Sequence, residues 1–232
     1  MARHGKTIGL LGGSFNPAHG AHRRISLHAL AALGLDEVWW LVSPGNVLKP
    51  AEGMASLPAR YASARRAART SPIRVTAIEA ELGTRYTVDT LKGIVRRYPR
   101  NRFIWLMGSD NLAQFHRWRD WRGIARLMPI AVIARPGYDA GAMASPAMVW
   151  LRRWRRRHGQ DHRFANGSLA RDGIGARRSI PALFQLRFDP DPLSATAIRA
   201  ADPDWHRRIP AGSLRDMLTK HPVRQTLRKG RS

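Results

Sequence analysis

Two histidines and three glycines lie within eleven residues near the start of the chain, in the string G-G-S-F-N-P-A-H-G-A-H from Gly12 to His22. Glycine lets a backbone approach a ligand closely, and the free N–H groups at the start of a helix suit a phosphate. His19 and His22 are three residues apart, which places them on one face of a first helical turn. Two imidazoles beside a phosphate-sized anion site indicate chemistry on a phosphate. The alternative is a turn that only packs and carries two surface histidines.

A strand and a helix must position these residues. The apolar run from Thr7 to Leu11 predicts a strand that ends at the two glycines, and Asn16-Pro17 predicts a turn. A helical apolar pattern follows, at Ile25, Leu27, Leu30, Ala31 and Leu33. The sequence therefore predicts a strand–turn–helix corner that presents both histidines.

The same stretch resembles the signature of the nucleotidylyltransferase superfamily, G-G-[ST]-F-[DN]-P-x-H-x-G-H. Ser14 and Asn16 are permitted variants, and both histidines are present. The departure is Gly20-Ala21, where the superfamily has any residue followed by glycine. The resemblance implies that the two imidazoles donate hydrogen bonds to phosphates.

Composition and charge limit the class of protein. The 232 residues suit one α/β domain, and no run of 18 apolar residues is present that could span a membrane. The absence of cysteine excludes disulfides and thiolate metal sites, and the N-terminus leads directly into the first strand, so we expect a cytoplasmic protein. Forty Lys and Arg against sixteen Asp and Glu give a formal charge of +24. Such a field attracts nucleotides, nucleic acid or anionic lipid without choosing among them, and arginine richness can also reflect genome composition.

Strands alternate with helices along the chain, which predicts a Rossmann-like, doubly wound and mostly parallel sheet with helices on both faces. The expected later strands are 37–42, 73–78, 102–107, 129–134 and 183–188, and the expected later helices are 57–68, 87–98, 194–201 and 210–221. Ligands of such folds bind beyond the carboxyl ends of the strands. Polar clusters follow five of the expected strands, at 12–22, 44–49, 108–110, 135–137 and 194–199. We expect these clusters to converge on one edge.

We expect a single domain over residues 1–222, with 139–181 as a basic, mobile insertion and 223–232 as a basic tail. The insertion contains a basic stretch with interleaved tryptophans, from Met148 to His158. It could bind RNA, lie on a membrane surface or contact another subunit. The alternative is a solvated helix that lodges Trp150, Leu151 and Trp154 against the body of the protein.

Further blocks resemble the bacterial nicotinate (or nicotinamide) mononucleotide adenylyltransferases of this superfamily. They are P-G-N at 44–46, Y-T-V-D-T at 86–90, G-S-D-N-L at 108–112 followed by Trp118, R-P-G at 135–137 and S-A-T-A-I-R at 194–199. The resemblance implies that the 5′-phosphate of a mononucleotide attacks the α-phosphorus of ATP in NAD biosynthesis, forming a dinucleotide and releasing pyrophosphate. The attacking oxygen is already an anion, so catalysis rests on positioning and on offsetting charge at phosphorus.

The resemblance also implies a site for each substrate, with His19 and His22 as the catalytic residues. The residues expected at ATP are Gly12, Gly13, Ser14, Phe15, Gly108, Asp110, Ser194, Thr196 and Arg199. The residues expected at the mononucleotide are Asn46, Lys49, Thr87, Trp118 and Arg135. No cluster has metal-ligand spacing, so we expect Mg²⁺ to arrive with ATP and to be held by phosphate oxygens.

Several alternatives stay open at this point. Asp110 could instead cap the next helix, and Ser194 to Arg199 could be an N-cap followed by a surface arginine. Trp121 rivals Trp118 as the stacking partner of a pyridine ring, whereas Trp39, Trp40 and Trp105 are better explained as core. The substrate could be nicotinamide mononucleotide, or the enzyme could be a phosphopantetheine adenylyltransferase. A basic RNA-binding protein is the rival from another class, and the oligomeric state is left open.

Overall fold

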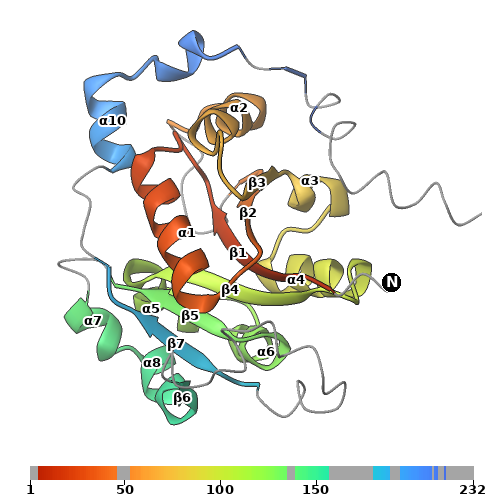
Figure 1. Cartoon of the computed structure of the whole chain (residues 1–232). Coiled ribbons are helices and arrows are strands. Elements are labelled where there is room, and N and C mark those ends of the chain that lie inside the picture. The colour runs from red at the N-terminus through yellow and green to blue at the C-terminus, as the bar shows by residue number, and fades with distance from the viewer. Residues whose placement is uncertain are drawn as a thin grey trace, which may run out of the picture.

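A seven-stranded parallel sheet runs through the centre of the computed structural model, which describes residues 5–45, 53–134, 139–156, 180–188, 194–210, 212, 213 and 217 (Figure 1). The strands are β1 (Thr7–Gly13), β2 (Glu37–Val42), β3 (Ile73–Thr76), β4 (Arg102–Gly108), β5 (Ile130–Ile133), β6 (Arg155–Arg156) and β7 (Leu183–Leu186). Their order across the sheet is β3-β2-β1-β4-β5-β7-β6, and every neighbouring pair is parallel. The expected doubly wound sheet is confirmed.

The α-helices of the described chain are α1 (Gly20–Leu33), α2 (Leu57–Ala67), α3 (Ile78–Leu82), α4 (Thr87–Arg97), α5 (Ser109–Gln114), α6 (Trp121–Leu127), α7 (Asp139–Met143), α8 (Pro146–Leu151) and α10 (Ala195–Ala201). Short 3-10 turns are η1 (Phe115–Arg117), η2 (Arg152–Trp154) and η5 (Trp205–Arg208). The third strand is shorter than expected, because Thr76 accepts the N–H of Ile78 at 2.9 Å and α3 begins there. The terminal helix and the tail expected after residue 210 lie almost entirely outside the described residues.

The strand order changes direction between β1 and β4. From β1 the chain moves outward through β2 to β3, and then returns to the other side of β1 for β4, β5 and β7. Such a reversal leaves a crevice at the carboxyl ends of the two strands, where doubly wound folds bind ligands. The loop that starts at Gly13 and the segment that follows Gly108 both begin at this crevice.

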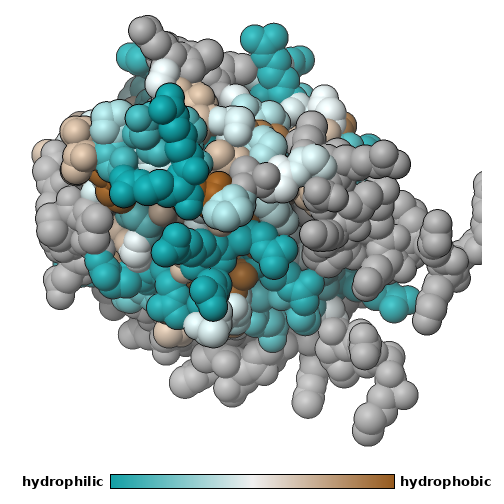
Figure 2. All heavy atoms as spheres, turned by 90° about the horizontal axis from the view of Figure 1, so that it is seen from above, coloured by the Kyte–Doolittle hydropathy of each residue, from teal (hydrophilic) through white to brown (hydrophobic). Residues whose placement is uncertain are grey.

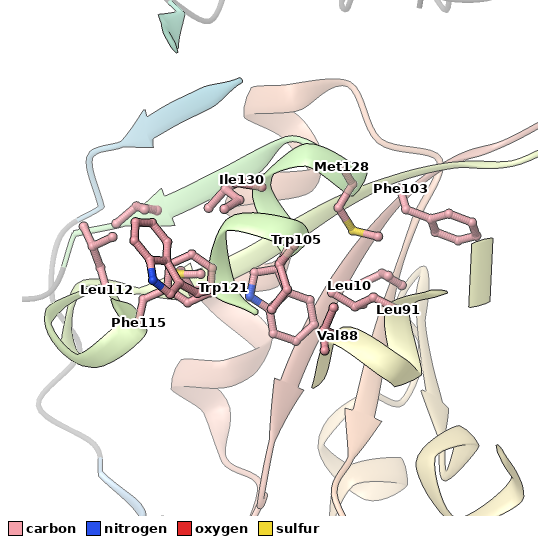
Figure 3. Packing of buried hydrophobic residues seen from close by; sticks show 14 of the residues in the cluster. Leu10, Val88, Leu91, Phe103, Trp105, Leu112, Phe115, Trp121, Met128 and Ile130 are labelled. Carbon is pink, nitrogen blue, oxygen red and sulfur yellow. The ribbon is translucent and has the colours of Figure 1, made fainter. Parts of the chain in front are cut away.

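Two apolar layers cover the sheet, one on each face. Neighbouring residues such as Trp39 and Trp40 belong to different layers, as the alternation of side chains along a strand requires. The first layer packs α4, α5 and α6 against β1, β4 and β5, with Trp105 and Phe115 among its buried side chains (Figure 3). The second layer packs α1 and α2 against the other face. Trp39, Trp40 and Trp105 are core residues, as the sequence predicts.

The first part of the expected insertion belongs to the folded domain. Leu151 is fully buried, Met148 lies in the first apolar layer, and Trp150 packs against that layer with its ring 5.2 Å from the ring of Trp121. Arg155 and Arg156 form the edge strand β6 beside β7. Residues 139–156 are therefore part of the folded domain, and for Trp150 and Leu151 the alternative of side chains lodged against the body of the protein holds. Residues 157–179 lie outside the described part of the chain.

No helix in the described residues is long and apolar enough to cross a membrane. A span needs about 20 apolar residues, whereas the longest of these helices, α1, has 14.

Candidate active site

The loop between β1 and α1 turns sharply at the carboxyl edge of the sheet. Phe15 has a φ of +48°, the Asn16–Pro17 peptide bond is cis, and His19 is the N-cap of α1. Phe15 is buried, and its ring stacks on that of Trp40 with 5.0 Å between the centroids. The strand–turn–helix corner expected from the sequence is present.

The two histidines of the corner lie against each other, with their ring centroids 4.0 Å apart. The backbone N–H of His19 donates to Nδ1 of His22 at 3.3 Å, and the N–H of His22 donates to the carbonyl of His19 at 3.0 Å. Because Nδ1 of His22 accepts a hydrogen bond, the proton of the neutral ring lies on Nε2. His22 can therefore donate from Nε2 to an anion.

The Asn16 side chain connects the loop to the segment that precedes α2. Its Nδ2 donates to the carbonyl of Gly53 at 2.9 Å, and its Oδ1 accepts the N–H of Ala55 at 3.2 Å. In the second turn of α2, Ser63 Oγ accepts the N–H of Ala18 at 3.1 Å. These bonds hold the loop on α2 as well as on α1.

Arg199 reaches this loop from a helix 183 residues later in the chain. Its Nη1 donates to the carbonyl of Asn16 at 2.6 Å, and its Nη2 donates to Thr196 Oγ1 at 3.2 Å. In Figure 1, α10 lies beside the N-terminal end of α1. Ser194 is the N-cap of α10 and accepts the N–H of Ala197 at 3.1 Å, so the capping alternative holds for Ser194. The alternative of a surface arginine is wrong, because Arg199 joins the histidine corner.

Two ionisable residues that sequence reasoning missed lie behind the corner, the buried Arg60 and the partly buried Glu79. Arg60 on α2 is 1% exposed, and it donates to the carbonyls of Ser14, Ser43, Pro44 and Ala55. Burial lowers the pKa of Arg60, and the charge of nearby Glu79 raises it. Burial raises the pKa of the Glu79 carboxyl to about 7, against smaller lowering effects from the Ser43 hydroxyl and the Arg60 charge. Composition gave no signal for this pair, because Arg60 is one of three arginines on α2.

Gly108 ends β4 and Asp110 follows it, across the crevice from the histidine corner. Gly108 is buried and is the N-cap of α5, and Asp110 lies in the first turn of that helix. The alternative that Asp110 caps the helix is therefore wrong. The neighbouring ends of β1 and β2 are also tied together, since Ser43 N–H donates to the carbonyl of Gly13 at 3.0 Å. The structure brings the blocks that follow β1, β2 and β4 to one edge.

Two of the blocks expected at the mononucleotide, those of Thr87 and Trp118, come together beside α4. The guanidinium of Arg119 lies 4.5 Å from the ring centroid of Tyr86, which places the residues next to Thr87 and Trp118 in contact. Trp118 is half-buried, whereas Trp121 is buried in the core against Phe115. Of the two tryptophans, Trp118 is thus the more accessible to a ring. Asn46, Lys49 and Arg135 lie outside the described residues.

The glycines at the end of β1 have packing reasons of their own. A Cβ on Gly12 would lie 2.6 Å from Cη2 of Trp105, and a Cβ on Gly13 would lie 3.3 Å from the Phe15 ring. Ala21 is buried in the first turn of α1, where the superfamily signature has glycine. Close packing therefore accounts for Gly12 even before a ligand is considered.

The described residues contain no group of three or more His, Cys, Asp or Glu side chains that could hold a metal ion.

Seen from above, over α2 and α10, the described surface is mainly hydrophilic, with scattered hydrophobic residues (Figure 2). Such a surface suits a charged, strongly hydrated ligand better than an apolar one.

Comparison with known proteins identifies the family. Residues 10–201 match the family described as cytidylyltransferase-like. A probable nicotinate-nucleotide adenylyltransferase from Erythrobacter litoralis is 64% identical over 215 residues, which cover 93% of each chain. Another protein of that name, from Cereibacter sphaeroides, is 49% identical over 193 residues, which cover 83% of this chain and 96% of its own. This chain belongs to the nicotinate-nucleotide adenylyltransferase family.

Solved structures share this fold. The nicotinic acid mononucleotide adenylyltransferase of Plasmodium falciparum complexed with NaAD gives a TM-score of 0.58 at 16% sequence identity and covers 84% of this chain and 83% of its own. Its complex with APC gives 0.56. At this identity the likeness concerns the fold alone, and it confirms the Rossmann-like nucleotidylyltransferase architecture. The family membership expected from the sequence blocks is also confirmed.

Proposed function

We propose that the protein transfers the adenylyl group of ATP to nicotinate mononucleotide, giving nicotinate adenine dinucleotide and pyrophosphate in NAD biosynthesis. The observation that carries the proposal is the bond of 2.6 Å from Arg199 to the carbonyl of Asn16, which joins the Ser194–Arg199 block to the histidine loop. These are two of the three blocks expected at ATP; they are far apart in sequence and meet at the loop that follows β1. The names of the bacterial relatives support the same activity.

The reaction needs no nucleophile from the protein. An oxygen of the mononucleotide 5′-phosphate forms the new bond to the α-phosphorus, and the bond between this phosphorus and the bridging oxygen to the β-phosphate breaks. The pyrophosphate leaves with that bonding pair. Catalysis then consists of holding two anions in line and offsetting the charge that spreads over the phosphoryl oxygens.

Each residue of the corner can supply a hydrogen-bond donor or a positive charge for the phosphoryl oxygens. His22 donates from Nε2, and His19 lies beside it at the start of α1. Arg199 contributes a fixed positive charge with forked donors at the same loop. Backbone N–H groups of Ser14 and Phe15 complete the set of donors expected at the phosphates. We propose that Mg²⁺ enters with ATP, since the described residues offer no carboxylate or imidazole cluster for it.

For the mononucleotide, we assign Trp118 as the face on which the pyridine ring stacks and Thr87 as a hydrogen-bonding group. The contact between Arg119 and Tyr86 supports this, because it holds the two segments together. Asn46, Lys49 and Arg135 remain candidates from the sequence blocks. Arg119 also adds positive charge on the side where the acid would bind.

The test is a pyrophosphate-release assay with ATP and nicotinate mononucleotide, combined with detection of the dinucleotide. We expect both products in equal amounts. The matched experiment uses nicotinamide mononucleotide, and we expect a lower kcat/KM. Equal values for the two mononucleotides would contradict the nicotinate assignment. RNA binding without pyrophosphate release would favour the rival from another class.

A further inference from the structure

Arg60 is a charged side chain in a place where an apolar one would be expected. It lies on the inner side of α2 at 1% exposure, and removing a charged group from water is costly unless hydrogen bonds compensate. Here they do. Nε donates to the carbonyl of Ala55 at 2.9 Å, Nη1 donates to the carbonyls of Ser14 at 2.7 Å and Ser43 at 2.6 Å, and Nη2 donates to the carbonyl of Pro44 at 3.0 Å.

The four carbonyls belong to three separate segments of the binding edge. Ser14 lies in the loop that leads from β1 to the histidines, and Ser43 and Pro44 follow the neighbouring strand β2. Ala55 precedes α2 itself. One planar, rigid guanidinium therefore fixes the exits of the two strands relative to each other.

The bond to Ser14 also sets the direction of a donor. In a trans peptide unit the C=O and the following N–H point in opposite directions within one plane. Because the Ser14 carbonyl is turned inward to Arg60, the N–H of Phe15 is turned away from α2. This N–H belongs to the set that the sequence signature assigns to the phosphates of ATP.

Other side chains hold the same segments, which shows that the loop is braced from α2. Asn16 bonds to Gly53 and Ala55, and Ser63 accepts the N–H of Ala18. Ser63 lies three residues after Arg60 on the inner side of α2 and is also buried. Arg60 differs from these groups because it alone reaches both the β1 and the β2 exits.

We propose that Arg60 is a positioning residue for adenylyl transfer, which aims the Phe15 N–H at the ATP phosphates and fixes the β2 exit that leads to Asn46. Arg60 contacts neither substrate. The inference rests on the proposed function, and it adds that α2, which carries none of the signature residues, is part of the catalytic apparatus.

The experiment compares Arg60→Ala and Arg60→Lys with Arg66→Ala, a control on the exposed side of the same helix. Lysine keeps the charge but lacks the fork, so it cannot serve three segments at once. We expect kcat of both Arg60 variants to fall by about 10²-fold, since a misplacement of about 1 Å can cost that much. The KM values for ATP and the mononucleotide should change less than kcat. The control should keep the activity of the unaltered protein.

Two readouts separate positioning from folding. Guanidinium at millimolar concentration should restore part of the activity of Arg60→Ala in a saturable manner and leave Arg66→Ala unchanged. Amide hydrogen exchange should be faster at residues 14–16 and at Ser43 and Gly45 of the folded Arg60→Lys protein, and unchanged in the strands of the core. This second readout needs no activity, so it tests the brace even if the proposed reaction is wrong.

Several results would overturn the proposal. One is a folded Arg60→Lys protein with normal kcat and normal exchange at both exits. Another is a loss of activity that guanidinium does not relieve and that follows only from a smaller folded fraction, with normal kcat per folded molecule. By contrast, an unaltered protein that makes no dinucleotide would contradict the proposed function and leave the exchange result to decide about Arg60.

Discussion

At the scale of single residues, three groups fix the His22 ring without help from a substrate. Its Nδ1 accepts the N–H of His19, its ring lies 5.0 Å from the ring of Phe15, and Trp40 meets it edge-on at 6.0 Å. The hydroxyl of Ser26 accepts the Trp40 N–H at 2.8 Å and donates to the His22 carbonyl at 2.8 Å. A donor that is held in advance loses little by reorganisation when charge develops on a phosphate.

His22→Ala should therefore lower kcat by about 10²–10³-fold, the usual cost of removing one such donor, while the protein stays folded. His28→Ala is the matched control, because His28 lies later on α1 against Phe188 at 5.1 Å. Steady-state kinetics and circular dichroism of both variants provide the check. A folded His22→Ala enzyme with a normal turnover would remove His22 from the mechanism.

Among individual residues, the sequence allowed the histidine corner to be predicted but not the reason for each glycine. His19 and His22 are three residues apart, so a single helical turn brings them together without any contact from the rest of the fold. Position 12 needs glycine because the ring of Trp105, a residue 93 positions later in the chain, occupies the space that a Cβ would take. A contact between residues so far apart in the chain leaves no local pattern.

At the scale of elements, Glu79 lies where α3, α2 and the end of β2 meet. Burial raises its pKa to about 7 from an ordinary value of 4.5, so the folded protein binds a proton at pH values where the unfolded chain has released it. The stability that comes from this proton is fully present below pH 4.5 and is lost as the pH rises to about 7. The folded state therefore becomes less stable over this window.

Glu79→Gln should remove this loss, because glutamine does not titrate. The free energy of unfolding of the unaltered protein, minus that of the variant, should fall between pH 5 and pH 7 by up to about 1.4 kcal/mol per pH unit. Urea unfolding of both proteins across this pH range measures this difference in the free energy of unfolding. Taking the difference cancels the contributions of the other titrating groups. Parallel curves for the two proteins would show that Glu79 ionises normally.

The sequence predicted the long elements well and the short ones poorly. The buried strands β1, β2 and β4 carry continuous apolar runs, and α4 has a clear helical face, so each has its own local signal. The five residues of α3 and the two of β6 are too short for any period. Arg60 was missed for a related reason, since hydropathy does not distinguish a buried arginine from the exposed Arg65 and Arg66 on the same helix.

At the scale of the whole molecule, the excess of positive charge acts on substrates before they reach the corner. Both substrates carry several negative charges, and a formal charge of +24 on 232 residues creates a field that raises their concentration near the surface. The exposed arginines around Trp150 contribute to this field, with Arg122, Arg126 and Arg153 each 5.9 Å from its ring. The described residues provide no carboxylate partner for these three.

Added salt should therefore lower kcat/KM, which includes the binding of both substrates, more than it lowers kcat. Between about 0.1 M and 1 M salt the screening length falls from about 10 Å to about 3 Å, so kcat/KM should fall by about tenfold or more while kcat at saturation changes much less. The measurement is a pyrophosphate-release assay at constant free Mg²⁺, with an uncharged osmolyte series as control. A kcat/KM that is the same at every salt concentration would mean that only the charges in the corner act on the substrates, and that the remaining arginines have no part in capture.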